Sequence, residues 1–351
     1  MATRIVGINI GFSTIRAAQV RLAQGKRPLV EKIHETPIPP GMVEFGDIKD
    51  QIGFTQLLKT FWVEAGFDTR RVVMAAGSLH VFSRELTVPK MSMQRVRESL
   101  PFLMQGVLPV PTDELYIDFY PSQELADETG PTIRGLAVAA ERSHVDTLVA
   151  CMSNAKLKPV GVDFIPFALT RARFNLGNSG GTVALVDVGA GATNIIIASD
   201  IVPLFVRIIT SGGQDIDRAL VLGLNLTPEE AAKTKLRLTQ KPSDSPDNSQ
   251  DLAAWKIMQS AMQDFVSGVK NTIDYFEQAH PDLAGKVSQV LLTGGGSQLA
   301  GIGPALEAVL LVPVTLDGGL TGVELLAGLE IPDEKMSQMA IAIGLAMGVS
   351  K

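Results

Sequence analysis

One glycine-bearing turn occurs twice in this chain, and the repeat constrains the fold more than any other feature. The first copy runs from Gly7 to Arg16 and the second from Asp187 to Ile195. In each copy a β-rich run enters a glycine turn and a second β-rich run leaves it, as in a hairpin. A third cluster, Gly294 to Gly296, follows another apolar run. Two similar hairpins so far apart indicate a duplicated α/β domain.

Glycine turns of this kind are suited to binding phosphate, because backbone N–H groups converge best where no Cβ intervenes. A single such turn is more often an ordinary hairpin, but three in this order favour a nucleotide site. Asp187 either holds water around a phosphate-bound Mg²⁺ or caps its turn. The predicted phosphate-binding residues are Asn9, Gly11, Phe12, Ser13 and Thr14 in the first turn, and Asp187, Gly189, Ala190, Gly191, Ala192 and Thr193 in the second.

Composition limits the classes of function. With 351 residues, 46% of them hydrophobic, the chain can build two domains with separate cores. The net charge is −6 with scattered Lys and Arg, which argues against nucleic acid as a partner. Cys151 is the single cysteine and the four histidines are dispersed, so we expect no disulfide and no zinc site. Without a signal sequence or a long apolar run, we expect a cytoplasmic protein.

A small lobe is expected inside the first half, because residues 82–157 are predicted to form a strand, a Met-rich helix, two strands and a helix. Pro101 is expected to kink or split the first of these helices. We expect Met91, Met93 and Met104 either to fill the core or to form an adaptable peptide-binding surface. Thr239 to Gln250 is expected to be a surface loop. The expected divisions are residues 1–81, 82–157, 158–180, 181–336 and 337–351.

The glycine motifs resemble those of the actin, Hsp70 and hexokinase superfamily, which has a two-lobed, ribonuclease H-like α/β fold. The resemblance implies that ATP and Mg²⁺ bind between the lobes, with Asn9 and Asp187 facing the metal through water. From the residues alone, the contact to the edge of the adenine base is either Lys235 or the pair Glu230 and Lys233. The adenosine-binding residues that it implies are Gly213, Lys235, Gly294, Gly295, Gly296 and Gln298.

Within the superfamily, the chain is most similar to the FtsA-like PilM family of type IV pilus assembly platform proteins. The similarity rests on Glu85 to Pro89, Val107 to Val110, Tyr116 to Phe119 and Ala155 to Asp163. It implies an ATP-binding scaffold at the cytoplasmic face of the inner membrane, contacting other platform and motor proteins, with self-association possible. It also implies a groove for the N-terminal peptide of a PilN-like membrane protein, for which the candidate contacts are Leu108, Pro109 and Val110.

Two positions depart from the family pattern. Asn9 stands where the family usually has Asp, which removes a charge that would order the Mg²⁺ shell and implies weak or absent hydrolysis. Ala232 stands where a Glu is usual, so Lys235 is the better-matched adenosine contact. Other functions remain open: a type II secretion platform protein, a small-molecule kinase, or an FtsA-like cell-division filament protein. The last is disfavoured because no basic amphipathic helix ends the sequence at Lys351.

Overall fold

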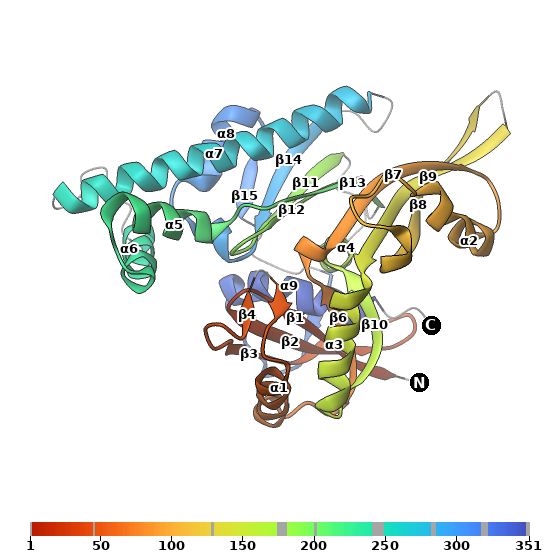
Figure 1. The fold of residues 1–351 in the computed structure, drawn as a ribbon, viewed down its shortest axis with the longest axis horizontal. Coiled ribbons are helices and arrows are strands. Elements are labelled where there is room, and N and C mark those ends of the chain that lie inside the picture. The colour runs from red at the N-terminus through yellow and green to blue at the C-terminus, as the bar shows by residue number, and fades with distance from the viewer. Residues whose placement is uncertain are drawn as a thin grey trace. The chain divides into compact units, whose positions relative to one another are not determined.

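The computed structural model describes residues 2–44, 46–127, 130–173, 181–199, 202–240, 249–281, 286–316 and 322–348. Its contacts divide the chain into two compact units (Figure 1). Unit 1 comprises Met1–Ser179, Ala198–Val206 and Gly319–Lys351, and unit 2 comprises Gly180–Ile197 and Arg207–Gly318.

The centre of unit 1 is a sheet with the strand order β10-β6-β1-β2-β3-β16. Strands β1, β2 and β3 form an antiparallel meander, whereas β6 runs parallel to β1, β10 parallel to β6, and β16 parallel to β3. The predicted first hairpin is therefore confirmed. The strand bounds are β1 Thr3–Ile10, β2 Thr14–Leu22, β3 Leu29–Pro37, β6 Arg71–Ala76, β10 Lys158–Phe164 and β16 Glu324–Leu325.

Helix α1 (Gln51–Ala65) covers this sheet with one apolar face. The Asp50 side chain accepts a hydrogen bond from the Gly53 N–H and caps the start of the helix. Gly66, in the left-handed conformation at φ 58°, ends it. Its apolar residues recur at helical spacing and enter the same core as β1, β6 and helix α3 (Arg142–Asn154). The residues of α1 in this core are Phe54, Leu58 and Phe61.

Helix α9 (Asp333–Met347) lies against β1 and helix α4 (Ile165–Arg173), and small residues permit the close approach. A Cβ on Gly7 of β1 would lie 1.9 Å from the carbonyl oxygen of Ala342. A Cβ on Gly344 would lie 1.9 Å from the carbonyl oxygen of Ala168. Glycine is thus required at both contacts, which fix α9 against its neighbours.

Residues 82–157 follow the predicted order of strand, helix, strand, strand and helix (Figure 1). Only the first four of these elements form a small subdomain of unit 1, because the last helix, α3, packs into the core of the main sheet with α1. The antiparallel sheet of this subdomain has the order β7-β9-β8 and one face covered by α2. Met104 is 1% exposed in this core, so the core-filling interpretation holds for it. Pro101 does not split α2, which continues through it and ends two residues later, at Leu103. The bounds are β7 Val81–Pro89, α2 Met93–Leu103, β8 Leu115–Asp127 and β9 Gly130–Glu141.

Three short elements flank this subdomain. The turn η1 (Ser78–His80) precedes β7, and η2 (Thr112–Glu114) precedes β8. Strands β4 (Val43–Glu44) and β5 (Asp47–Ile48) form a small separate hairpin.

A second sheet, most of which belongs to unit 2, has the order β13-β12-β11-β14-β15, in which β11, β14 and β15 are parallel neighbours. All of β11 is buried, as expected for a strand covered on both faces. The predicted second hairpin is formed by β11 and β12. The strand bounds are β11 Thr182–Val188, β12 Thr193–Ser199, β13 Val202–Ile209, β14 Val287–Thr293 and β15 Val314–Leu316.

Helices α5, α6 and α7 of unit 2 share one apolar core. Helix α6 begins after Thr227, whose hydroxyl accepts from the Glu230 N–H while the Glu230 carboxylate accepts from the Thr227 N–H. Most of the expected surface loop, at residues 241–248, lies outside the described residues. The remaining bounds are α5 Gly213–Leu224, α6 Pro228–Gln240, α7 Ser249–Ala279, α8 Ile302–Leu310 and η3 Gly295–Gln298.

Candidate functional site

The second glycine turn joins β11 to β12 and is closed by one backbone hydrogen bond. The Gly189 N–H donates to the Ala192 carbonyl at 3.0 Å. A Cβ on Gly189 would lie only 2.6 Å from that carbonyl oxygen, so the turn requires glycine there.

The first turn is built in the same way. The Gly11 N–H donates to the Thr14 carbonyl at 3.0 Å, with the same spacing of three residues. Ser13 is exposed, and its carbonyl accepts from the Ile38 N–H, which ties the turn to the end of β3. The structural equivalence of the two turns supports the duplication inferred from the sequence.

The second turn is anchored to the start of helix α5. The Gly213 N–H donates to the Gly189 carbonyl at 3.0 Å, and the Gln214 N–H donates to the Ala190 carbonyl at 2.8 Å. A Cβ on Gly212 would lie 2.5 Å from the Gly189 carbonyl oxygen. Backbone hydrogen bonds therefore hold the turn against α5, and substitutions at Gly212 would displace it.

The third glycine cluster lies against the end of β11. Gly294 has a φ of 82°, and a Cβ there would lie 2.5 Å from the Val188 carbonyl oxygen and 2.6 Å from Oδ1 of Asp187. A Cβ on Gly295 would meet no atom within 4 Å, so this backbone faces open space. Because β11 and β14 are parallel, their carboxyl ends meet at one edge, where open α/β sheets usually bind ligands.

Asp187 lies at this edge and is held by a neighbour on β12. It is 5% exposed, and its carboxylate accepts a hydrogen bond from the Asn194 side-chain amide at 2.9 Å. Thr193 is fully buried, and its hydroxyl donates to the Ser211 carbonyl at 2.7 Å. The Thr193 proton thus serves the packing of unit 2, whereas Asp187 combines a negative charge with a fixed orientation.

Asn9 occupies the corresponding position in the first turn, two residues before the turn glycine. It is 8% exposed and is paired in register with Arg16 on β2. The Arg16 guanidinium forms an ion pair with Glu35 at 3.2 Å. Arg16 stands where the second turn has Asn194, since each lies five residues after the turn glycine. The first hairpin therefore pairs an amide with a cation, whereas the second pairs an acid with an amide.

Two of the predicted adenosine contacts meet at the start of α5. The Lys235 ammonium donates to the Gly213 carbonyl at 3.0 Å and to the Asp217 carboxylate at 2.6 Å. The alternative pair is engaged elsewhere, because Lys233 forms an ion pair with Glu229 and Glu230 caps α6. The structure thus brings Lys235, and not Lys233, to the glycine-rich edge of unit 2.

An apolar pocket lies beside this edge within unit 2. It extends from the end of β11 and the start of α5 to α7 and the start of α8. The predicted contact Gln298 of η3 is exposed. Apolar walls with few polar groups are usual for small-molecule sites. The lining residues are Val188, Ser211, Gly212, Asp215, Ile216, Ala261, Met262, Phe265, Leu299 and Ile302.

The candidate partner residues follow helix α2 in the small subdomain. Leu108 packs against the subdomain core, whereas Pro109 is exposed. Next to them the Phe102 side chain is 78% exposed and Val107 is 49% exposed. Exposed apolar residues gathered on one segment are typical of a contact surface. Sequence reasoning had not singled out Phe102 for this role.

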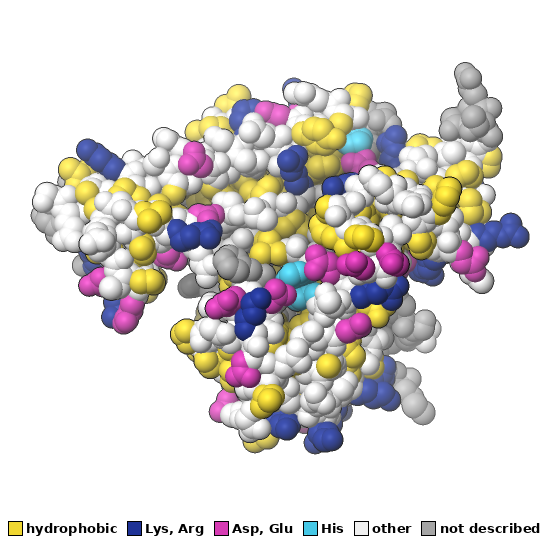
Figure 2. All heavy atoms as spheres, viewed as in Figure 1, with side chains coloured by type: hydrophobic (Ala, Val, Ile, Leu, Met, Phe, Trp, Pro, Cys, Tyr) yellow, Lys and Arg dark blue, Asp and Glu magenta, His cyan; other side chains and the backbone are white. Residues whose placement is uncertain are grey.

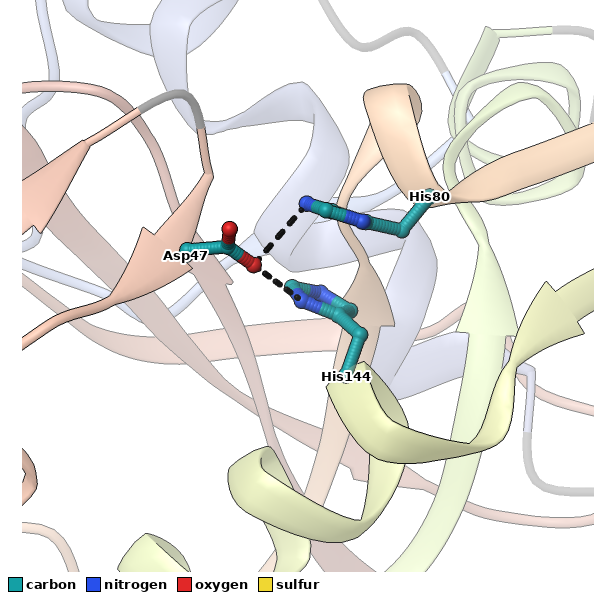
Figure 3. Close-up of side chains that lie close together, drawn as sticks. All are labelled: Asp47, His80 and His144. Carbon is teal, nitrogen blue, oxygen red and sulfur yellow. Dashed lines mark ion pairs between the residues drawn. The ribbon is translucent and has the colours of Figure 1, made fainter. Parts of the chain in front are cut away.

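A histidine cluster in unit 1 was not foreseen. His80 and His144 stack with ring centroids 4.2 Å apart, and the Asp47 carboxylate lies beside both (Figure 3). The sequence gives no signal for this, because the three residues come from η1, α3 and β5 and only the fold brings them together. The other singled-out residue, Cys151, is buried, and burial raises the pKa of its thiol, as expected for a structural cysteine.

No helix among the described residues is both long and apolar enough to cross a membrane.

Comparison with known proteins places the chain in a family. A chain of the PilM-PilN type IV pilus biogenesis complex superimposes with a TM-score of 0.84 and 24% identity, over 98% of both chains. MreB5 of Spiroplasma citri bound to ADP gives a TM-score of 0.54 and 10% identity, over 98% of this chain and 95% of that one. These likenesses show an actin-like fold, which confirms the predicted α/β class.

Sequence comparison gives two further matches. The cell division protein FtsA of Bacillus subtilis (strain 168) is 26% identical over 144 residues, which are 38% of this chain and 33% of FtsA. The matched segment thus spans about a third of that relative. The model of the family described as type IV pilus assembly protein PilM matches residues 7–349. The chain therefore belongs to the PilM family of type IV pilus assembly proteins.

Proposed function

We propose that this protein is a nucleotide-binding scaffold of a type IV pilus assembly platform, held at the inner membrane by a PilN-like partner. The observation that carries the nucleotide part is the glycine-rich edge of unit 2. There a glycine turn closed by its own backbone, a fixed Asp187 and the bare backbone of Gly295 adjoin an apolar pocket.

The ligand of this edge is proposed to be ATP with Mg²⁺. Backbone N–H groups of the turn suit the phosphates, and Asp187 suits the hydration shell of the metal. The base is proposed to lie beside Gly213 and Lys235, at the mouth of the small apolar pocket. The equivalent turn at Gly11 in unit 1 has the same backbone closure and is proposed to bind phosphate as well. Asn9 in place of a carboxylate favours binding over rapid hydrolysis.

Binding of a fluorescent ATP analogue, with and without Mg²⁺, tests this proposal. The informative variant is Gly295→Val, which fills open backbone space without a steric conflict in the unliganded fold. We expect at least about a tenfold loss of affinity, since a branched side chain would occupy ligand space. Gly303→Val, on α8 with its nearest non-local atom 3.9 Å away, is the matched control. Absence of binding to the unmodified protein at saturating ATP would refute the nucleotide role.

The partner is proposed to be the N-terminal peptide of a PilN-like membrane protein. A solved relative forms a complex with PilN, and the exposed apolar residues Phe102 and Val107 adjoin Leu108 to Val110 in this chain. An apolar segment of a peptide would bury these side chains at about 25 cal/mol per Å² of apolar surface removed from water. Calorimetric titration with that peptide is the direct test, and no heat of binding with or without ATP would argue against the partner.

A further inference from the structure

The histidine cluster has a defined set of contacts. Nδ1 of His80 lies 3.1 Å from the Glu141 carboxylate, and Nε2 lies 3.1 Å from Oδ1 of Asp47. The second contact is close but not aligned for a hydrogen bond. Nδ1 of His144 lies 3.7 Å from the same Asp47 oxygen. One carboxylate therefore serves two stacked imidazoles, and a second carboxylate orients one of them (Figure 3).

The tautomer of His144 follows from its other nitrogen. Nε2 accepts a hydrogen bond from the backbone N–H of Gly77 at 3.2 Å. A nitrogen that accepts carries no proton, so the proton of the neutral ring lies on Nδ1 and faces Asp47. Adding a proton at Nε2 would set two N–H groups against each other. Protonation of His144 is thus incompatible with the contact to Gly77.

The same geometry argues against a metal site, although Asp47, His80 and His144 offer ligand atoms within 4.8 Å of one another. A metal ion lies near the plane of each imidazole that binds it, whereas these rings are nearly parallel, at 14°, and stacked. A ligating histidine also donates from its second nitrogen, and the second nitrogen of His144 accepts instead. Lys49, which forms an ion pair with Asp47, adds a positive charge where a cation would sit.

The location of the cluster links it to the small subdomain. The chain enters this subdomain at β7, directly after His80, and leaves it after Glu141 at the end of β9. His144 follows in the first turn of α3, and Asp47 belongs to the β4–β5 hairpin. The cluster therefore ties both chain crossings at the root of the subdomain to the hairpin. On the face in Figure 2, histidine reaches the surface among acidic side chains.

We propose that Asp47, His80, Glu141 and His144 form a proton-operated latch at the root of the small subdomain, closed while His144 is neutral and opened when His144 takes a second proton. Opening separates His144 from Gly77 and places a positive charge on the His144 ring. The root of the subdomain is then freed from the β4–β5 hairpin. If the subdomain binds the partner peptide, which rests on the proposed function, the latch makes that binding dependent on pH.

The surroundings of the pair fix the direction of the effect. Burial, followed by the charge of His80, lowers the pKa of His144 to about 4, while Asp47 and Glu141 oppose the shift. Burial acts to raise the pKa of Asp47, but Lys49 and the two histidines together lower it. Of the other charged groups on α3, Arg142 lies over the Tyr116 ring and Asp146 accepts from the Tyr116 hydroxyl. Helix α1 packs against α3 through apolar residues.

The latch is therefore closed at neutral pH and opens as the pH falls. An open His144 would have an ordinary pKa near 6.5, so protons bind the open form first. The neutral His144 ring stabilises the closed latch fully above about pH 6.5, and this stabilisation is lost as the pH falls toward 4. Between pH 7.5 and pH 5 this linkage favours opening by roughly 30-fold.

Hydrogen exchange of the unmodified protein tests the latch without any ligand. We expect protection factors, which correct for the intrinsic pH dependence, to fall more than about tenfold at residues 77–81 and 141–145 between pH 7.5 and 5. His144→Gln retains an acceptor for Gly77 and cannot titrate, so its protection should change little. His34→Gln, a histidine of unit 1 outside the cluster, should behave like the unmodified protein.

Two further measurements separate the outcomes. NMR of the His144 ring should show a proton on Nδ1 at pH 7.5; a proton on Nε2 would overturn the latch even if His144→Gln fails to fold. Titration with Zn²⁺ should give no binding that His144→Gln abolishes, and such binding would replace the latch with a metal site. Peptide titration at both pH values then tests the coupling. If the peptide binds equally well at both pH values while hydrogen exchange depends on pH, the latch stands but is not coupled to peptide binding. If the peptide binds at neither pH, the result counts against the proposed partner.

Discussion

The Asp187 carboxylate accepts a hydrogen bond from the Asn194 amide at 2.9 Å, and both side chains are buried. In the first hairpin the equivalent positions hold Asn9 and Arg16. The two turns share their backbone closure but differ in charge. The acidic copy is suited to Mg²⁺, whereas the copy with arginine is suited to an anion.

Asn194→Ala should weaken Mg²⁺-dependent binding of ATP by about tenfold, because Asp187 loses the donor that orients it. Loss of a partner for a buried carboxylate should also lower the free energy of unfolding by about 1–3 kcal/mol. Affinity would be measured with and without Mg²⁺, and stability by urea unfolding. An unchanged Mg²⁺ dependence would show that Asp187 does not serve the metal.

Asn9→Asp should make nucleotide binding more dependent on Mg²⁺, since it adds a carboxylate at a position that is 8% exposed. Without ligand the variant should be less stable by about 1–3 kcal/mol, because a buried charge replaces a neutral amide. The melting temperature with and without Mg²⁺-ATP checks both statements. Asn225→Asp, at the end of α5 and away from the turns, is a matched control. Equal ligand stabilisation in both proteins would contradict the role assigned to Asn9.

The sequence was sufficient for the features that rest on local chemistry. The glycines at 11 and 189 predicted both turns, and the pattern of residues 82–157 predicted the order of strands and helices there. It could not supply contacts between distant segments. Nothing in the spacing of Asp47, His80 and His144 indicates that they meet, and the anchor of Lys235 at Gly213 depends on how α6 packs against α5. The roles of these residues in binding nucleotide and peptide stay predictions.

Glu31 should contribute to acid sensitivity. It is 8% exposed and lies 2.7 Å from Arg4, 3.2 Å from Arg21 and 2.8 Å from the Gln19 amide. Burial acts to raise its pKa, but these partners together lower it. A lowered pKa gives stability that is complete above the ordinary value near 4.5 and is lost as the pH falls through the folded value. In Glu31→Gln, the free energy of unfolding should therefore fall less steeply as the pH drops into the acidic range. The same pH dependence in the variant and the unmodified protein would contradict this.

Phe102→Ala should weaken binding of the PilN-like peptide without lowering stability, because the side chain is 78% exposed. Removing a large apolar contact from an interface typically costs about 1–3 kcal/mol, a tenfold or greater loss of affinity. Val63→Ala, at an 81% exposed position on α1, is the control for general surface effects. Equal peptide affinity in Phe102→Ala and the unmodified protein would move the contact surface away from α2.

Gly7→Ala should destabilise unit 1, because its Cβ would lie 1.9 Å from the Ala342 carbonyl oxygen and 2.6 Å from the Ala346 nitrogen. Both are backbone atoms of α9, so the helix must move away from β1. Overpacking of this kind costs about 1–3 kcal/mol and sometimes more. Gly161→Ala on β10 is the matched control, since its Cβ would meet only Val73 methyl groups at ordinary contact distances of 3.8 and 3.9 Å. Chemical unfolding of both variants should show a large loss for Gly7→Ala and little for Gly161→Ala. Equal stabilities would mean that α9 does not depend on close contact with β1.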